Sequence, residues 1–131
     1  MLAPGLSHTS RLLVGQGDTA SAQGSGDMPV LATPRLIALM ENAALQAVAP
    51  ALDEGMTTVG GEISVKHLAP SPVGATIEAH ALLISVEGRK LTFDLSARQL
   101  QPADEQGGKL VGEGTHVRFI VHRQKFLDKL S

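Results

Sequence analysis

The sequence predicts a small α+β domain in which a curved antiparallel sheet wraps one long apolar helix. Three observations predict this fold class. Residues 33–50 form a strongly apolar stretch with helical punctuation at both ends. Beyond residue 56 the hydrophobic period changes from about 3.6 to about 2 residues. The later segments are joined by short, turn-like links, so their strands pair antiparallel and can curl over the helix.

Composition bounds the class of protein. At 131 residues one domain spanning residues 1–131 is expected. Hydrophobic residues make up 43% of the chain and aromatic residues only 2%, so the core is aliphatic and base stacking has little to work with. With a formal charge of −2, the chain has no overall positive charge that would attract nucleic acid. It contains no cysteine, which excludes thiol catalysis and cysteine-bound zinc.

The first thirty residues carry weaker signals. Residues 1–10 read as a loose terminus, residues 11–15 as a short strand, and the Gly- and Ser-rich residues 16–29 as a mobile flap. The glycines of this flap match neither phosphate-binding pattern. No segment resembles a signal peptide or an apolar membrane span, so we expect a cytoplasmic protein without membrane association.

The apolar helix is predicted to begin and end at defined residues. Thr33 is expected as its N-cap, with Pro34 at the first helical position, where the missing N–H costs nothing. Pro50 disfavours helical geometry at the residue before it, so the helix ends there. Because the interior is almost entirely aliphatic, other structure must cover most of its circumference.

Glu41 is the one misplaced residue of this helix. The polar residues Arg35, Asn42 and Gln46 share one stripe, and Glu41 points about 100° away from it, among apolar neighbours. An ionised carboxylate without a partner costs several kcal/mol in such surroundings. Glu41 therefore either snorkels or pairs with a distant cation, or it serves as an acid, base or nucleophile. We take the second interpretation as the working hypothesis.

The remaining chain alternates as strands do. In residues 56–68 one face carries apolar or small residues and His67. Residues 69–74 break the strand, residues 87–89 make a tight turn, and residues 101–108 form a polar loop. The predicted strands after the first of these are residues 75–86, 90–100 and 109–122, and Phe126, Leu127 and Leu130 suggest a closing turn of helix.

His67 is expected on the inward face of its strand, toward the helix that carries Glu41. A lone His on an apolar face is more often a hydrogen-bonded core residue than a catalyst. Opposite a misplaced carboxylate the balance changes, because a Glu–His pair in a dry site suits general acid–base chemistry. Thr33 is sufficiently explained as the helix cap.

Gly60 and Gly61 stand in mid-strand, where glycine is unfavourable. Two explanations remain open. Either a ligand approaches the backbone there and a free N–H holds a developing oxyanion, or the pair forms a bulge that lets the sheet bend over the helix.

The C-terminal end is locally basic. Arg118 shares a strand face with His116, and we expect its side chain to point outward into solvent, as arginine side chains usually do. Together with Arg123, Lys125 and Lys129 it could contact phosphate groups. The histidines besides His67 show no metal-ligand spacing, and no nucleophile-elbow motif of serine hydrolases occurs.

Several of these segments resemble the hotdog-fold thioesterases, and the fluoroacetyl-CoA thioesterase family in particular. The resemblance covers roughly residues 30–130. It is carried, in order, by V-L-A-T and L-M-E-N-A-A of the helix, L-D-E-G after it, Gly60 and the strand ending at His67, and then by G-R-K-L-T-F and G-T-H-V-R.

The resemblance implies hydrolysis of an acyl-CoA thioester without a metal or other cofactor. It also implies a homodimer or higher homo-oligomer with its sites at the subunit interface. Thr33, Glu41 and His67 inherit the catalytic roles, and Gly60 and Arg118 match positions that contact substrate. Gly61 joins the expected substrate-binding residues through the mid-strand glycine pair. Glu41 then either attacks the carbonyl or activates water. The flap residues 21–28 contain no Phe, unlike the fluoroacetate-specific member, so another small or medium acyl group is expected.

Two other functions fit the same scaffold. One is a non-catalytic module that binds acyl-CoA or a similar small ligand, and it predicts ligand-dependent stabilisation without thiol release. The other is a hotdog dehydratase or hydratase, because these enzymes also use Glu and His. The sequence around His67 lacks the motifs that are usual in those enzymes.

Overall fold

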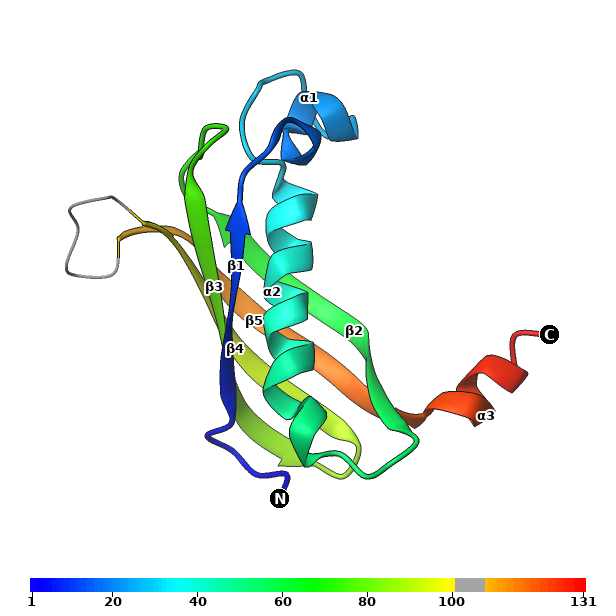
Figure 1. The fold of residues 1–131 in the computed structure, drawn as a ribbon. Helices are drawn as coiled ribbons and strands as arrows, with labels where there is room; N and C mark the ends of the chain where they lie inside the picture. The colour runs from blue at the N-terminus through cyan, green and yellow to red at the C-terminus, as the bar shows by residue number, and fades with distance from the viewer. Residues whose placement is uncertain (101–107) are drawn as a thin grey trace.

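The computed structural model describes residues 1–100 and 108–131, and the loop expected at residues 101–108 falls outside them apart from Gly108. Five strands and one long helix make up the body of the molecule (Figure 1). The strands are β1 (Ser7–Leu13), β2 (Met56–His67), β3 (Thr76–Glu87), β4 (Lys90–Leu100) and β5 (Lys109–His122). The helical segments are η1 (Gln16–Asp18), α1 (Ala20–Gln23), α2 (Thr33–Val48), η2 (Ala49–Ala51) and α3 (Arg123–Asp128).

The strands form one antiparallel sheet in the order β1-β3-β4-β5-β2. The expected fold class is confirmed. However, β2 pairs with β5 and not with its sequence neighbour β3. The connection between β2 and β3 carries Pro70 and Pro72 and passes the start of α2, where the Leu31 N–H donates to the Ser71 carbonyl at 2.8 Å. In the described chain β2 therefore lies at an edge of the sheet with one side unpaired.

Helix α2 lies along the sheet and supplies the centre of the core (Figure 1). Its buried apolar residues recur at helical spacing and face the strands, whereas Ala38 is exposed and Ile37 and Leu45 are half-buried. The apolar faces of α2 and of the sheet are both aliphatic, and Phe93 is the phenylalanine buried between them. The buried residues of α2 are Leu36, Leu39, Met40, Ala43, Ala44, Ala47 and Val48.

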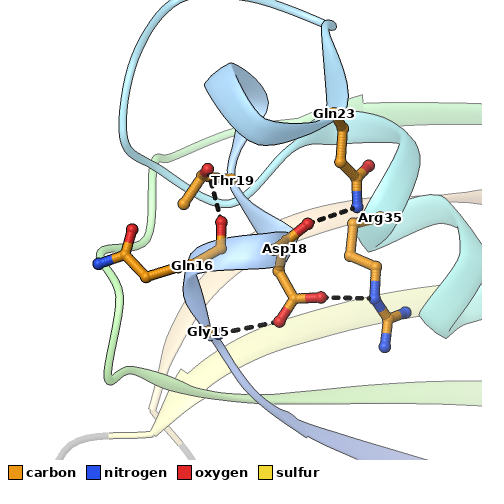
Figure 2. A network of polar contacts seen from close by, with 7 residues as sticks. Gly15, Gln16, Asp18, Thr19, Gln23 and Arg35 are labelled. Carbon is orange, nitrogen blue, oxygen red and sulfur yellow. Dashed lines mark hydrogen bonds and ion pairs between the residues drawn. The ribbon is translucent and has the colours of Figure 1, made fainter.

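The N-terminal region is more regular than expected. Strand β1 begins at Ser7, not at residue 11, because Ser7–Leu13 pair with the edge of β3 through their backbones although most of their side chains are polar. The expected loop at residues 16–29 contains η1 and α1. Figure 2 shows how this flap is held: the Asp18 carboxylate accepts from the Gly15 N–H at 2.8 Å and from Arg35 Nε at 3.0 Å.

A β-bulge interrupts β2 at Gly61. Gly60 pairs with Arg118 and Glu62 with Val117, which leaves Gly61 without an opposite residue. The bulge explains why two glycines stand together here, since a Cβ on Gly61 would overlap the Phe119 ring. It also shifts the strand's alternation. Ile63 packs against the core as expected, but on the other side of the bulge the inward residue is Thr58 and not Val59.

We expect Gly114→Ala to destabilise the fold by about 1–3 kcal/mol, because β2 and β5 approach closely at this position. A Cβ on Gly114 would lie 2.8 Å from the Val65 Cα and 2.9 Å from the Ser64 carbonyl carbon. Equilibrium urea unfolding measures the change. Thr115→Ala, at the exposed neighbouring position, serves as the control and should stay within about 0.5 kcal/mol of wild type. Equal stability of the two variants would contradict the close approach.

Candidate active site

Thr33 and His67 form a hydrogen-bonded pair at the N-terminal end of α2. The helix is capped by Ala32 without any side-chain hydrogen bond, so the expected N-cap role of Thr33 is wrong by one residue. As the first helical residue, Thr33 points its hydroxyl sideways instead of along the axis. Its Oγ1 lies 2.8 Å from His67 Nδ1. The hydroxyl is thus committed to the imidazole and orients its ring.

His67 ends β2 and lies beside a pocket beneath the flap. Its Nε2 is buried and has no hydrogen-bond partner among the described residues. Burial lowers the pKa of His67, opposed in part by the backbone at Ala69, so the imidazole is neutral at pH 7. The pocket has a volume of about 360 Å³. Thr33 and His67 share its wall with mainly small or apolar residues, including Met28, Val30, Leu31, Leu68, Ala69 and Pro70.

Glu41 lies two turns further along α2, at the margin between helix and β2. Its side chain is 40% exposed, so the expectation that it faces the apolar interior is wrong. This side of the helix meets β2 where the strand has no side chain: a Cβ on Gly60 would lie 3.1 Å from Glu41 Oε2. Glycine at this position therefore brings the carboxylate directly against a strand backbone.

Arg118 faces Glu41 from β5 and is 7% exposed, which corrects the expected outward orientation. Three contacts explain its burial. Its Nε donates to Thr58 Oγ1 at 2.8 Å and its Nη2 to the Thr58 carbonyl at 2.9 Å. Its Nη1 lies 4.0 Å from Glu41 Oε2. Because the bulge turns Thr58 inward, the guanidinium finds acceptors there and is held as a fixed cation beside the carboxylate.

His116 completes this cluster and was missed as a site residue. It is 2% exposed, and its Nδ1–H donates to the Glu62 carbonyl at 2.8 Å. That tautomer leaves Nε2 to accept from Arg118 Nη1 at 3.2 Å. Burial lowers the pKa of His116, and Arg118 lowers it further, so the ring stays neutral. Its place on the same strand face as Arg118 was the one sequence signal that pointed to it.

The structure does not bring Glu41 and His67 together within one chain. Glu41 shares a pocket of about 250 Å³ with Gly60, Gly61 and His116, whereas His67 lines the pocket beneath the flap. His67 does face α2 as expected, but it meets Thr33. The eight residues from Thr33 to Glu41 span about 12 Å of helix, which separates the two groups. We call them the Thr33–His67 pair and the Glu41 cluster (Glu41, Gly60, His116 and Arg118).

Within residues 1–100 and 108–131, no three His, Asp or Glu side chains come together in a way that could hold a metal ion. None of the helices in those ranges is both long enough and apolar enough to cross a membrane.

Comparisons with known proteins agree on one family. The family model described as "FlK: Fluoroacetyl-CoA-specific thioesterase" matches residues 14–124. The fluoroacetyl-CoA thioesterase of Streptantibioticus cattleyicolor is 40% identical over 101 residues, which cover 77% of this chain and 68% of that protein. A crystal structure of FlK superposes with a TM-score of 0.85 at 33% identity, covering 99% of this chain and 96% of that one.

A more distant structure shows the fold alone. The hot-dog-like protein of Thermanaerovibrio acidaminovorans is 20% identical and covers 98% of this chain and 90% of its own, with a TM-score of 0.82. Together with FlK it identifies the architecture as the hotdog fold, in agreement with the prediction from the sequence.

Two histidines, the half-buried His67 and the buried His116, make stability depend on pH in a defined direction. Burial lowers the pKa of His67 and of His116 from their ordinary value of 6.5. Just below that value the unfolded chain binds more protons than the folded chain, so the free energy of unfolding falls as the pH falls. His67→Asn should flatten this slope below pH 6.5 in denaturant titrations. The control His8→Asn, at an exposed position of β1, should keep it. Parallel curves for His67→Asn and wild type would count against the burial of this imidazole.

Proposed function

The chain belongs to the FlK family of fluoroacetyl-CoA-specific thioesterases, and on this basis we propose that it hydrolyses an acyl-CoA thioester to the free acid and coenzyme A. One observation carries the proposal: the Glu41 carboxylate lies beside a fixed cation and against a strand that has no side chain at Gly60. A planar thioester carbonyl can reach the carboxylate there, because only backbone stands in its way.

We propose Thr33, Glu41 and His67 as the catalytic set, with Gly60, Gly61 and Arg118 in contact with substrate. Glu41 either adds to the carbonyl carbon or takes a proton from a water that adds to it. Both routes use the Glu41 carboxylate, and Arg118 places a cation 4.0 Å from it. The carbon–sulfur bond then breaks, and the leaving thiolate takes up a proton. On the route through Glu41 addition, this leaves a mixed anhydride, which a water cleaves to release the free acid and restore the Glu41 carboxylate. Neutral His67, positioned by Thr33, is suited to moving that proton.

Two copies of the chain are needed to assemble this set. The Glu41 cluster lies beside Gly60 and the Thr33–His67 pair lies at His67, seven residues apart on β2. The outer edge of β2 is free of partners in the described chain. Antiparallel pairing of two β2 edges about their midpoint, near Ile63 and Ser64, would bring the His67 end of one strand to the Gly60 region of the other. We therefore propose a homodimer with two composite sites.

Several further points belong to this proposal. The whole chain, residues 1–131, acts as one hotdog domain. The pocket beneath the flap takes the acyl group, and its lining by Met28, Val30 and Leu31, without any Phe, suits a small or medium aliphatic chain. The substrates named for relatives, fluoroacetyl-CoA among them, mark the class of thioester to test first. The cytoplasmic location stays a prediction.

Glu41→Gln should reduce kcat by about a thousandfold, because it keeps the shape of the side chain and removes the charge. The assay follows thiol release from a panel of acyl-CoAs of increasing chain length. Glu113→Gln, at an exposed position of β5, is the matched control and should keep wild-type rates. If purified Glu41→Gln is as fast as wild type, the assignment fails. A wild-type protein that is stabilised by acyl-CoA but releases no thiol would be a binding module.

The composite site predicts complementation between two inactive variants. In an equal mixture of Glu41→Gln and His67→Asn subunits, heterodimers carry one intact site, and random assortment predicts about a quarter of wild-type activity. Subunits are mixed in mild denaturant and refolded before the assay. Recovery would not occur if each chain carried its own complete site. Size-exclusion chromatography with light scattering on the same samples reports whether dimers form.

A further inference from the structure

The C-terminal helix borders a second pocket that the catalytic proposal does not use. Helix α3 follows β5 at the end of the sheet where β2 begins (Figure 1), and the Arg123 N–H donates to the Gly55 carbonyl at 2.9 Å. The pocket has a volume of about 290 Å³. We call it the basic pocket; its lining residues are Met56, Arg89, Val121, His122, Lys125, Phe126 and Lys129.

The charged residues that line this pocket are all basic. Arg89, Lys125 and Lys129 supply basic side chains, and no residue of the lining is acidic. Among the residues that the structure describes, none of these three forms an ion pair. The chain as a whole has a formal charge of −2, so this concentration of positive charge is a local departure from its composition. Unpaired cations around a hollow favour an anionic ligand with several acceptor oxygens.

The floor of the same pocket is apolar. Met56, Val121 and the Phe126 ring line it, and Phe126 is 40% exposed. An exposed ring next to cations suits a flat aromatic group that carries phosphates, because the ring covers the face of the base while the cations bind the oxygens. A phosphorylated nucleotide has this combination of parts, whereas a simple inorganic anion would leave the apolar floor unused.

One lining residue of the basic pocket, Met56, lies on the same face of β2 as the Glu41 cluster. Gly60 faces Glu41, and by alternation Thr58 and Met56 share its face. Met56, in the lining of the basic pocket, is four residues from Gly60, or about 13 Å along the strand. Coenzyme A carries its thioester at one end of an extended pantetheine arm and a phosphorylated adenosine at the other. Such an arm can bridge this separation.

We propose that the basic pocket binds the phosphorylated adenosine of the acyl-CoA substrate and thereby lowers its KM. This inference rests on the proposed thioesterase function and adds the residues that recognise the half of the substrate that does not react. Lys125 and Lys129 bind the phosphates together with Arg89 of the same lining, and the adenine lies against Phe126 and Met56.

The test compares two thioesters of the same acyl group, one with coenzyme A and one with N-acetylcysteamine, which lacks the nucleotide. Lys125→Glu and Lys129→Glu should each raise KM for the acyl-CoA about tenfold, through the loss of a charge-assisted contact, and leave kcat unchanged. With the N-acetylcysteamine thioester, kcat/KM should equal that of wild type. Lys109→Glu makes the same charge change at an exposed position of β5 and should leave KM for both substrates unaltered.

The outcomes separate this inference from the proposed function. Unchanged KM for acyl-CoA in both lysine variants would overturn the basic pocket while leaving the hydrolase intact. If wild type releases no thiol from any substrate, calorimetry with adenosine 3′,5′-bisphosphate still decides the pocket: wild type should bind it and Lys125→Glu should not. Loss of binding to anionic lipid vesicles without a change in KM would assign the cations to a membrane surface instead and overturn the inference.

Discussion

The burial of α2 against the sheet is the constraint on which the rest of the structure depends. Seven apolar side chains of this helix are buried, and removing them from water is the main favourable contribution to the core. The packing leaves the helix no freedom to slide or rotate over the strands. Thr33 and Glu41 are therefore held at set positions over β2, although neither residue contributes to the apolar contact itself.

Glycine where α2 crosses β2 leaves room for the Glu41 cluster in this packing. Gly60 lets the strand backbone approach Glu41, and the bulge at Gly61 changes which side of β2 faces inward. Thr58 is turned toward Arg118 by that change and supplies two acceptors for the guanidinium. A buried cation without such partners would be strongly unfavourable. The bulge thus explains both the buried arginine and its position near the carboxylate.

The free edge of β2 in the described chain is the feature on which the proposed homodimer rests. An exposed strand edge presents unpaired N–H and C=O groups, and pairing with another copy satisfies them. The Glu41 cluster and the Thr33–His67 pair lie toward opposite ends of this strand. The proposed two-fold axis through its middle would satisfy the strand edge and bring the two groups of residues together. The flap is tied to α2 by the ion pair between Asp18 and Arg35, and its residues line the pocket beside Thr33.

The sequence by itself determined the fold class, the long apolar helix, the strand segments after it and the family, because these follow from local periodicity and from the order of motifs. It also singled out Thr33, Glu41, His67, Gly60 and Arg118. Only the tertiary structure decided that β2 pairs with β5, that the hydroxyl of Thr33 meets His67, and that Arg118 and His116 are buried around Glu41. The alternation of side chains along a strand predicts which face of the sheet each residue occupies. A bulge moves every later side chain to the opposite face, and neither a bulge nor a pairing between non-sequential strands leaves a local signal in the sequence.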